Sequence, residues 1–88
     1  MSEKNPETHS IENLRKEIDD CDEAILAYVK RRTEISREIG KIRAADGGPR
    51  IVPAREAQIH EYYSSLGPEG SELVDILLRL GRGPSSDA

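Results

Sequence analysis

One arginine interrupts an apolar pattern in the first half of the chain. Ten positions recur every three or four residues, and we call them the seam: Ile11, Leu14, Ile18, Cys21, Ile25, Tyr28, Arg32, Ile35, Ile39 and Ile42. This spacing is typical of a helix that packs one stripe against other helices, so Arg32 is expected to point inward. A buried guanidinium without a partner would cost several kcal/mol. Arg32 therefore has to meet an anion, either an Asp or Glu of a neighbouring helix or an anionic ligand.

Two further arginines could join Arg32 around a small ligand. Arg43 follows eleven residues later, which is about three helical turns and places the two backbones about 16 Å apart on nearly the same face. Arg15 precedes Arg32 by about 25 Å along the helix axis and cannot reach the same ligand within one chain. In an antiparallel pair of long helices, the start of one lies beside the middle of the other. A partner chain could therefore supply Arg15.

The second half of the chain adds Arg50, Arg55 and Glu56 to these cations. Together they form a set of four or five cations and one carboxylate. The sequence offers no Ser/His/Asp set, no metal-ligand spacing and no Gly-rich phosphate motif. Such a constellation suits a small dianion, and it predicts neither a metal nor a cofactor. His9 and His60 are expected to be surface histidines, and Cys21, the only cysteine, a small packed side chain.

A long first helix should carry the seam. Ser10 is a suitable N-cap, and the glycines and proline within 45–49 should end the helix. The seam from Ile11 to Ile42 would be about 48 Å long at 1.5 Å per residue. The remaining half of the chain is too short to cover it. Self-association through this helix is therefore expected.

Two shorter helices should follow. Pro53 suits the first position of a second helix, which is expected to end at Gly67 after about four turns. A third should begin near Pro68 or Ser71, be apolar on nearly every side and become the most enclosed element. The sequence Gly81-Arg82-Gly83-Pro84 is expected to cut it off. The predicted fold class is therefore all-α, a three-helix chain with one long N-terminal helix.

Composition limits the classes of protein that remain. The chain has 88 residues, so it can build one small domain, predicted over 10–83 between flexible segments 1–9 and 84–88. A formal net charge of -4 argues against nucleic-acid binding. No stretch is apolar enough to span a bilayer, and the polar start lacks the apolar region of a signal peptide. We expect a cytoplasmic protein without a membrane partner.

Four segments of the sequence resemble the all-helical chorismate mutases, which are intertwined dimers of three-helix chains. The matching segments are residues 14–19, 25–35, 39–43 and 55–56. They occur in the family's order and offsets, and the pattern covers about two-thirds of the chain. The resemblance implies an intertwined antiparallel homodimer that rearranges chorismate to prephenate, a step toward phenylalanine and tyrosine. This pericyclic reaction requires no nucleophile, base or cofactor.

The resemblance also implies a role for each candidate site residue. Arg32 and Arg15 of the partner chain would bind the two carboxylates of chorismate. Arg43 stands where the family has a cation, often lysine, at the breaking ether oxygen. The remaining implied roles concern the second helix and the loop before it. Glu56 would accept from the ring hydroxyl, the backbone near Val52 would assist, and Arg55 would orient the site or lie beside a carboxylate.

Two departures from the family pattern predict weak activity for the isolated chain. Other members carry a glutamine or glutamate late in the third helix, where this sequence has 81–84. Other members also carry an aspartate at the position of Val52. Both features resemble the short subclass that is activated in a complex with DAHP synthase, the first enzyme of the shikimate pathway. That enzyme is the predicted partner.

Two alternatives remain open. An isochorismate-pyruvate lyase on the same fold also needs an arginine-lined pocket. A non-catalytic helical dimer that regulates a larger enzyme would pair Arg32 internally and bind no ligand. The sequence separates mutase from lyase weakly, chiefly through Glu56 and the cation at Arg43.

Overall fold

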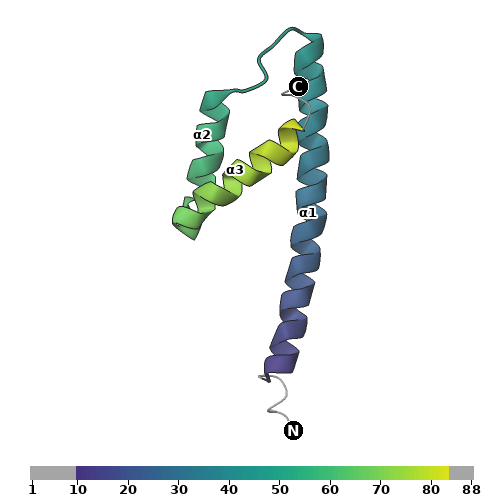
Figure 1. Ribbon diagram of the computed structural model, residues 1–88, viewed down its shortest axis with the longest axis vertical. Helices are drawn as coiled ribbons and strands as arrows, with labels where there is room; N and C mark the ends of the chain where they lie inside the picture. Colours follow the sequence, from purple (N-terminus) through teal and green to yellow (C-terminus); the bar gives the residue numbers. More distant parts are fainter. Residues whose placement is uncertain (1–9, 84–88) are drawn as a thin grey trace. The chain divides into compact units, whose positions relative to one another are not determined.

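A computed structural model describes residues 10–83 of the chain, and its regular elements are helices (Figure 1). They are α1 (Ile11–Ala45), α2 (Pro53–Tyr62), the short 3-10 helix η2 (Ser64–Leu66) and α3 (Pro68–Arg82). No strand occurs within the described range. The predicted all-α class with one long N-terminal helix is confirmed. The predicted flexible segments 1–9 and 84–88 lie outside the described residues, and the single domain over 10–83 stays a prediction.

The chain divides into two compact units, residues 1–30 and 31–88. In the first unit the described residues form the N-terminal part of α1. Ser10 caps this helix as predicted, because its Oγ accepts a hydrogen bond from the backbone N–H of Asn13 at 3.0 Å. Cys21 and Tyr28 were expected to be packed, but both are exposed. A unit made of one helix cannot bury its own apolar face, so the seam is open in the single chain.

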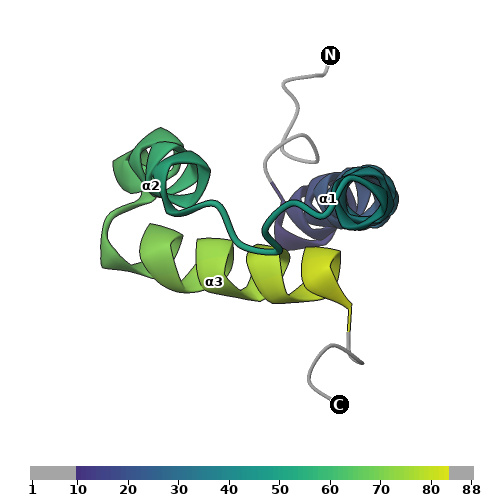
Figure 2. The same cartoon turned by 90° about the horizontal axis from the view of Figure 1, so that it is seen from above.

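The second unit contains the rest of α1 together with α2, η2 and α3. Figures 1 and 2 show α2 and α3 side by side, joined through η2, with the C-terminal end of α3 beside α1. The buried apolar side chains are Ile59 of α2 and Val74 and Leu77 of α3. As predicted, α3 has the most buried residues of the three helices. Its burial is one-sided, however, because Ile76 on the same helix is 47% exposed.

The second helix is shorter than expected. It ends at Tyr62 after 10 residues, and η2 replaces the predicted last turns. At this point the Ser64 hydroxyl donates to the carbonyl of Glu61 at 2.7 Å, and the N–H of Leu66 donates to the carbonyl of Tyr63, three residues back. Side-chain hydrogen bonds of this kind compete with the α-helical ladder and favour the tighter 3-10 turn.

The third helix ends at Arg82, inside the stretch 81–84 that was predicted to end it, and Gly81 still lies within α3. Gly81 is buried where α3 meets α1, and a Cβ on it would clash with the side chain of Ser36. The glycine therefore serves a close helix approach. Gly83 is the true stop: it has a φ of 85°, and its N–H donates to the carbonyl of Arg79 at 3.2 Å.

Replacing Gly81 with alanine should destabilise the protein by about 1 to 3 kcal/mol, because the added methyl has no room against Ser36. Gly40 supplies the matched control within α1, since a Cβ there meets nothing within 4 Å. Gly40→Ala should be neutral or stabilise by about 0.5 to 1 kcal/mol through helix propensity. Urea unfolding followed by circular dichroism measures both. Equal stability of the two variants would show that the α1–α3 approach tolerates a methyl group.

Within residues 10–83, none of the helices has both the length and the apolar character that crossing a membrane requires.

Candidate functional site

A pocket of about 200 Å³ lies in the second unit. Five arginines, one carboxylate, one hydroxyl and five apolar side chains line it: Arg32, Arg43, Arg50, Arg55, Arg82, Glu56, Ser36, Ile35, Ile39, Val52, Ile59 and Leu78. The excess of guanidinium groups over carboxylates makes the pocket strongly cationic, although the whole chain carries -4. Such a pocket is built for a small molecule with more than one negative charge.

Five of the six site residues predicted from the sequence line this one pocket. They come from α1, from the loop that follows it and from the first turn of α2: Arg32, Arg43, Val52, Arg55 and Glu56. Arg15 does not line the pocket; it is an exposed residue of the first unit. Its assignment to a partner chain's site stays a prediction, as do the individual roles of the other five.

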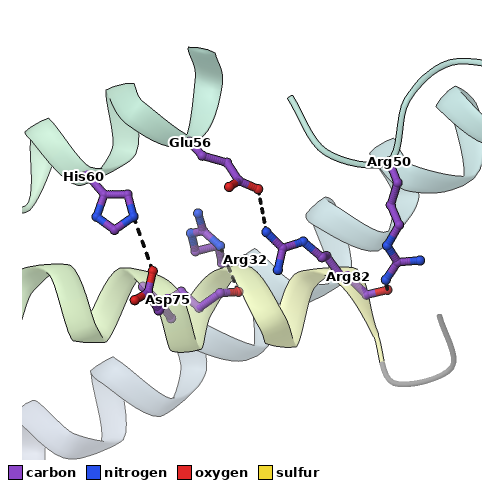
Figure 3. Close-up of polar contacts among 7 residues, drawn as sticks. Arg32, Arg50, Glu56, His60, Asp75 and Arg82 are labelled. Atoms are coloured by element: carbon purple, nitrogen blue, oxygen red, sulfur yellow. Dashed lines mark hydrogen bonds and ion pairs between the residues drawn. The ribbon is translucent and has the colours of Figure 1, made fainter. Parts of the chain in front are cut away.

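Arg32 is half-buried in the pocket wall. One guanidinium nitrogen, Nη1, donates to the backbone carbonyl of Leu77 at 3.4 Å (Figure 3). Among residues 10–83, no carboxylate lies within ion-pair distance of Arg32; the two described pairs involve other residues. The seam arginine is thus inward-facing within its unit and still has capacity for an anion. This arrangement favours the ligand interpretation over an ion pair within the chain.

Three arginines donate to carbonyls near the end of α3. Besides Arg32, Arg37 donates to the carbonyl of Leu80 through Nε and Nη2, at 3.3 and 3.2 Å, and Arg50 donates to the carbonyl of Arg82 at 3.3 Å. The last four carbonyls of a helix have no partner inside it and carry the negative end of its dipole; those of Leu80 and Arg82 belong to this group, whereas that of Leu77 lies earlier in the helix. The end of α3 therefore helps to fix the orientation of Arg32 and Arg50, which line the pocket.

Glu56 is the only carboxylate among the described residues of the wall, and it is already paired. Its Oε2 accepts from Nη2 of Arg82 at 2.6 Å, and both side chains are about one-quarter exposed (Figure 3). Glu56 lies in the first turn of α2, where a helix dipole favours an acid, and Pro53 at the start preorganises that turn. The pair joins α2 to the end of α3 across the pocket.

The sequence placed Arg82 in the stretch expected to end the third helix and assigned it no contact. In the structure α3 runs to Arg82, and that side chain reaches Glu56. A signal was present: Arg82 follows Leu78 by four residues, and residues four apart share one face of a helix. Continuing the third helix through Gly81 places Arg82 on the same face as Leu78, which lines the pocket.

Two other wall residues have simpler surroundings. Arg43 is half-buried, and its backbone carbonyl accepts from the N–H of Gly48 at 2.7 Å in the turn that ends α1. Arg55 is exposed and donates to Oε1 of Gln58 at 3.2 Å on the same helix. Within the described residues neither guanidinium has a carboxylate partner. Both are therefore available for an anion.

A Ser/His/Asp group that the sequence spacing did not reveal lies outside this pocket. His60 of α2 is close to two residues of α3. Its Nε2 lies 3.3 Å from Oδ1 of Asp75 (Figure 3), and its Nδ1 lies 3.2 Å from Oγ of Ser71. The histidine is half-buried instead of being a plain surface residue, but the Asp75 side chain is 57% exposed. None of the three lines the arginine pocket. The group joins α2 to α3.

The sequence pattern of the family described as chorismate mutase type II matches residues 14–80. The intracellular chorismate mutase of Mycobacterium tuberculosis (strain H37Rv) is 58% identical over 73 residues, which are 83% of this chain and 70% of that protein. The corresponding protein of Mycolicibacterium smegmatis is 54% identical over 74 residues, covering 83% and 71%. Among solved structures, a non-covalent complex of DAHP synthase and chorismate mutase from Corynebacterium glutamicum, with a bound transition-state analogue, matches with a TM-score of 0.79. That match has 49% identity and covers 83% of this chain and 89% of the other. The chain therefore belongs to the chorismate mutase type II family.

Proposed function

We propose that this chain rearranges chorismate to prephenate in the arginine pocket of its second unit. The observation that carries the proposal is the composition of that pocket: five arginines and Glu56 around about 200 Å³, in a chain of this family. Chorismate carries two carboxylates, a hydroxyl and an ether oxygen. The pocket offers cations for the first, an acceptor for the second and a further cation for the third.

The reaction moves electrons within one molecule. The ether C–O bond breaks while a C–C bond forms, and no proton or electron is exchanged with the protein. Catalysis then rests on holding the flexible substrate in a compact conformer and on stabilising charge that develops on the ether oxygen. Arg32 would bind a carboxylate. Arg43, about three turns further along α1, would stabilise the ether oxygen.

Glu56 would accept a hydrogen bond from the ring hydroxyl, with the backbone near Val52 assisting. In the structure Glu56 is paired with Arg82, whose guanidinium contacts one of the two carboxylate oxygens. The other oxygen can accept from a substrate hydroxyl only if the pair leaves room for it. Arg55, in the first turn of α2, would orient the site or lie beside a carboxylate.

The proposed active form is an antiparallel homodimer in which each pocket receives Arg15 from the partner chain. Support comes from the exposed seam: Ile18, Ile25 and Tyr28 are 58%, 58% and 71% exposed in the single chain. A helical face that exposes apolar side chains over several turns is typical of a helix–helix interface.

Mixing two inactive variants tests the shared site. Arg15→Ala and Arg32→Ala should each be nearly inactive alone. After unfolding and refolding together, half of the dimers are mixed, and each has one intact site, so about a quarter of wild-type activity should return. An affinity tag on the Arg32→Ala chain alone provides the control for exchange, because the tagged chain captures untagged Arg15→Ala only when mixed dimers have formed. If the Arg15→Ala and Arg32→Ala mixture stays inactive although mixed dimers are captured, Arg15 does not act across the dimer.

DAHP synthase is the proposed partner, and the cytoplasm the proposed location. The solved relative from Corynebacterium glutamicum is a complex with DAHP synthase, and the mycobacterial relatives are named intracellular chorismate mutases. The end of α3 is the element through which a partner could act, because it orients Arg32 and Arg50 and carries Arg82.

Loss of chorismate absorbance by the purified chain tests the proposed reaction directly. Slow consumption by the isolated chain, with prephenate as product, is the expected result. Release of pyruvate from isochorismate, without consumption of chorismate, would favour the lyase. No turnover of either compound, alone or with DAHP synthase, would leave the non-catalytic regulatory dimer, which also predicts no stabilisation by a bicyclic dicarboxylate.

A further inference from the structure

A second hollow in the same unit adjoins the arginine pocket. It has a volume of about 430 Å³ and borders the last turns of α1, the loop after them and the end of α3. Its wall contains five basic side chains: Arg37, Lys41, Arg43, Arg50 and Arg82. No acidic side chain is among the described residues that line it. Five like charges around one space repel one another unless an anion occupies it.

Carboxylates in the described part of the chain do not neutralise all five of these basic side chains. Arg82 is paired with Glu56, while Arg37 and Arg50 donate to uncharged carbonyls of α3. Lys41 and Arg43 have no carboxylate partner among residues 10–83. At least four positive charges are thus unpaired in a chain whose formal net charge is -4.

We infer that this hollow is a second anion site, distinct from the substrate pocket, for a small molecule with a diphosphate or several phosphate groups. Arginine forks bind phosphate oxygens in pairs, and a lysine adds a point charge. The hollow is larger than the arginine pocket, and its cations come from α1, from the loop after it and from the end of α3, so several anionic groups can be contacted at once. A single carboxylate would leave most of these charges unpaired.

The two sites share part of their walls, which couples them. Arg43, Arg50 and Arg82 line both spaces, whereas Arg37 and Lys41 line only the second. A guanidinium that turns toward a phosphate in the second site gives up hydrogen-bonding capacity in the first. Occupation of the second site is therefore expected to weaken binding of a dicarboxylate in the first, and the effect must be reciprocal.

Lys41 provides a clean test, because it is exposed and lines only the second hollow. The probe is inorganic pyrophosphate, titrated by calorimetry into the full chain at constant ionic strength. Lys41→Gln should bind about threefold to tenfold more weakly than the wild type, as expected for one charge-assisted contact near the surface. Lys30→Gln is the matched control: it removes the same charge from an exposed position of α1 that lines neither space.

A second variant protects the test from an indirect effect of Lys41. Gly40 also lines the hollow, and a side chain there has open space, so Gly40→Glu should fold and should weaken pyrophosphate binding by placing a carboxylate in the wall. No pyrophosphate binding by the wild type would overturn the proposal. Equal affinities of the wild type, Lys41→Gln and Lys30→Gln would overturn it too, because the probe would then occupy the arginine pocket or bind without a site. Since no chorismate is present, these outcomes are independent of the proposed reaction.

Coupling gives the confirming measurement. Pyrophosphate should lower the affinity of the wild type for a bicyclic dicarboxylate that mimics the rearrangement, and Lys41→Gln should reduce this effect. Direct competition in the arginine pocket would be the same in both proteins. An undiminished effect in Lys41→Gln would therefore contradict the shared-wall argument.

Discussion

Replacing Arg32 with alanine should lower kcat/KM for chorismate by roughly 10² to 10³, the usual cost of removing one preorganised cationic donor. Arg32 is half-buried in the pocket wall and has no carboxylate partner among residues 10–83, so its charge is available to the substrate. Its one described hydrogen bond, to the carbonyl of Leu77, is long at 3.4 Å. Folding should therefore lose less than about 1 kcal/mol, because a weak hydrogen bond contributes little net stability.

Ligand-induced stabilisation separates this role from a structural one. A bicyclic dicarboxylate at 100 times its Kd should stabilise the wild type by about 2.7 kcal/mol, and Arg32→Ala should lose most of that effect. Arg31→Ala is the control, since Arg31 is the adjacent exposed arginine and does not line the pocket. An Arg32→Ala protein that unfolds several kcal/mol more easily, with the wild type unaffected by the dicarboxylate, would instead support a buried ion pair in a regulatory dimer.

The positions of the helices and much of the pocket could be predicted because their signals are local. Ser10 caps α1, glycine and proline end it near Ala45, and Pro53 begins α2, all as expected from their backbone preferences. The three-and-four spacing of the seam is sufficient to predict that Arg32 lies on an inward face. Local order of this kind depends on neighbours within one or two turns, which a sequence displays directly.

The contacts at the end of α3 could not be predicted in the same way because they depend on distant residues. Gly81 has the type of a helix stop, but it is helical and lies against Ser36, 45 positions earlier in the sequence, where a Cβ would not fit. With the helix continued, Arg82 reaches Glu56, and Arg50 reaches the last carbonyl. The predicted burial of Cys21 and Tyr28 likewise depends on packing against a second chain, and both side chains are exposed in the single chain.

A common element links the arginine pocket, the proposed second anion site and the proposed partner. The carbonyls of α3 accept from Arg32, Arg37 and Arg50, and its last residue, Arg82, lines both spaces. A small shift of this helix end would therefore reorient several guanidinium groups together. Regulation through α3 needs no change in the chemistry of the pocket, only in which of its charges face the substrate.

Saturating DAHP synthase from the same source should raise kcat/KM of the chain for chorismate by at least about tenfold. An increase of this size is expected when a pocket that rarely adopts its competent arrangement is shifted to adopt it most of the time. In the isolated chain Arg82 holds Oε2 of Glu56 at 2.6 Å, so the carboxylate proposed to accept the substrate hydroxyl is engaged elsewhere. A partner that binds the end of α3 better when Arg82 has left Glu56 would favour the competent arrangement by that difference in affinity. The measurement is the rate of chorismate loss as the synthase is titrated.

Removing Arg82 tests whether activation acts through this pair. Arg82→Ala frees Glu56, so the isolated variant should be about threefold to tenfold more active than the wild type, and the synthase should add correspondingly less. Arg79→Ala, an exposed arginine of the same helix that lines neither space, should behave as the wild type does. If Arg82→Ala is less active alone and is activated by the same factor as the wild type, Arg82 binds substrate directly and the synthase acts elsewhere. Full activity of the unmodified chain without the synthase would remove the argument for activation, while the proposed reaction would stand.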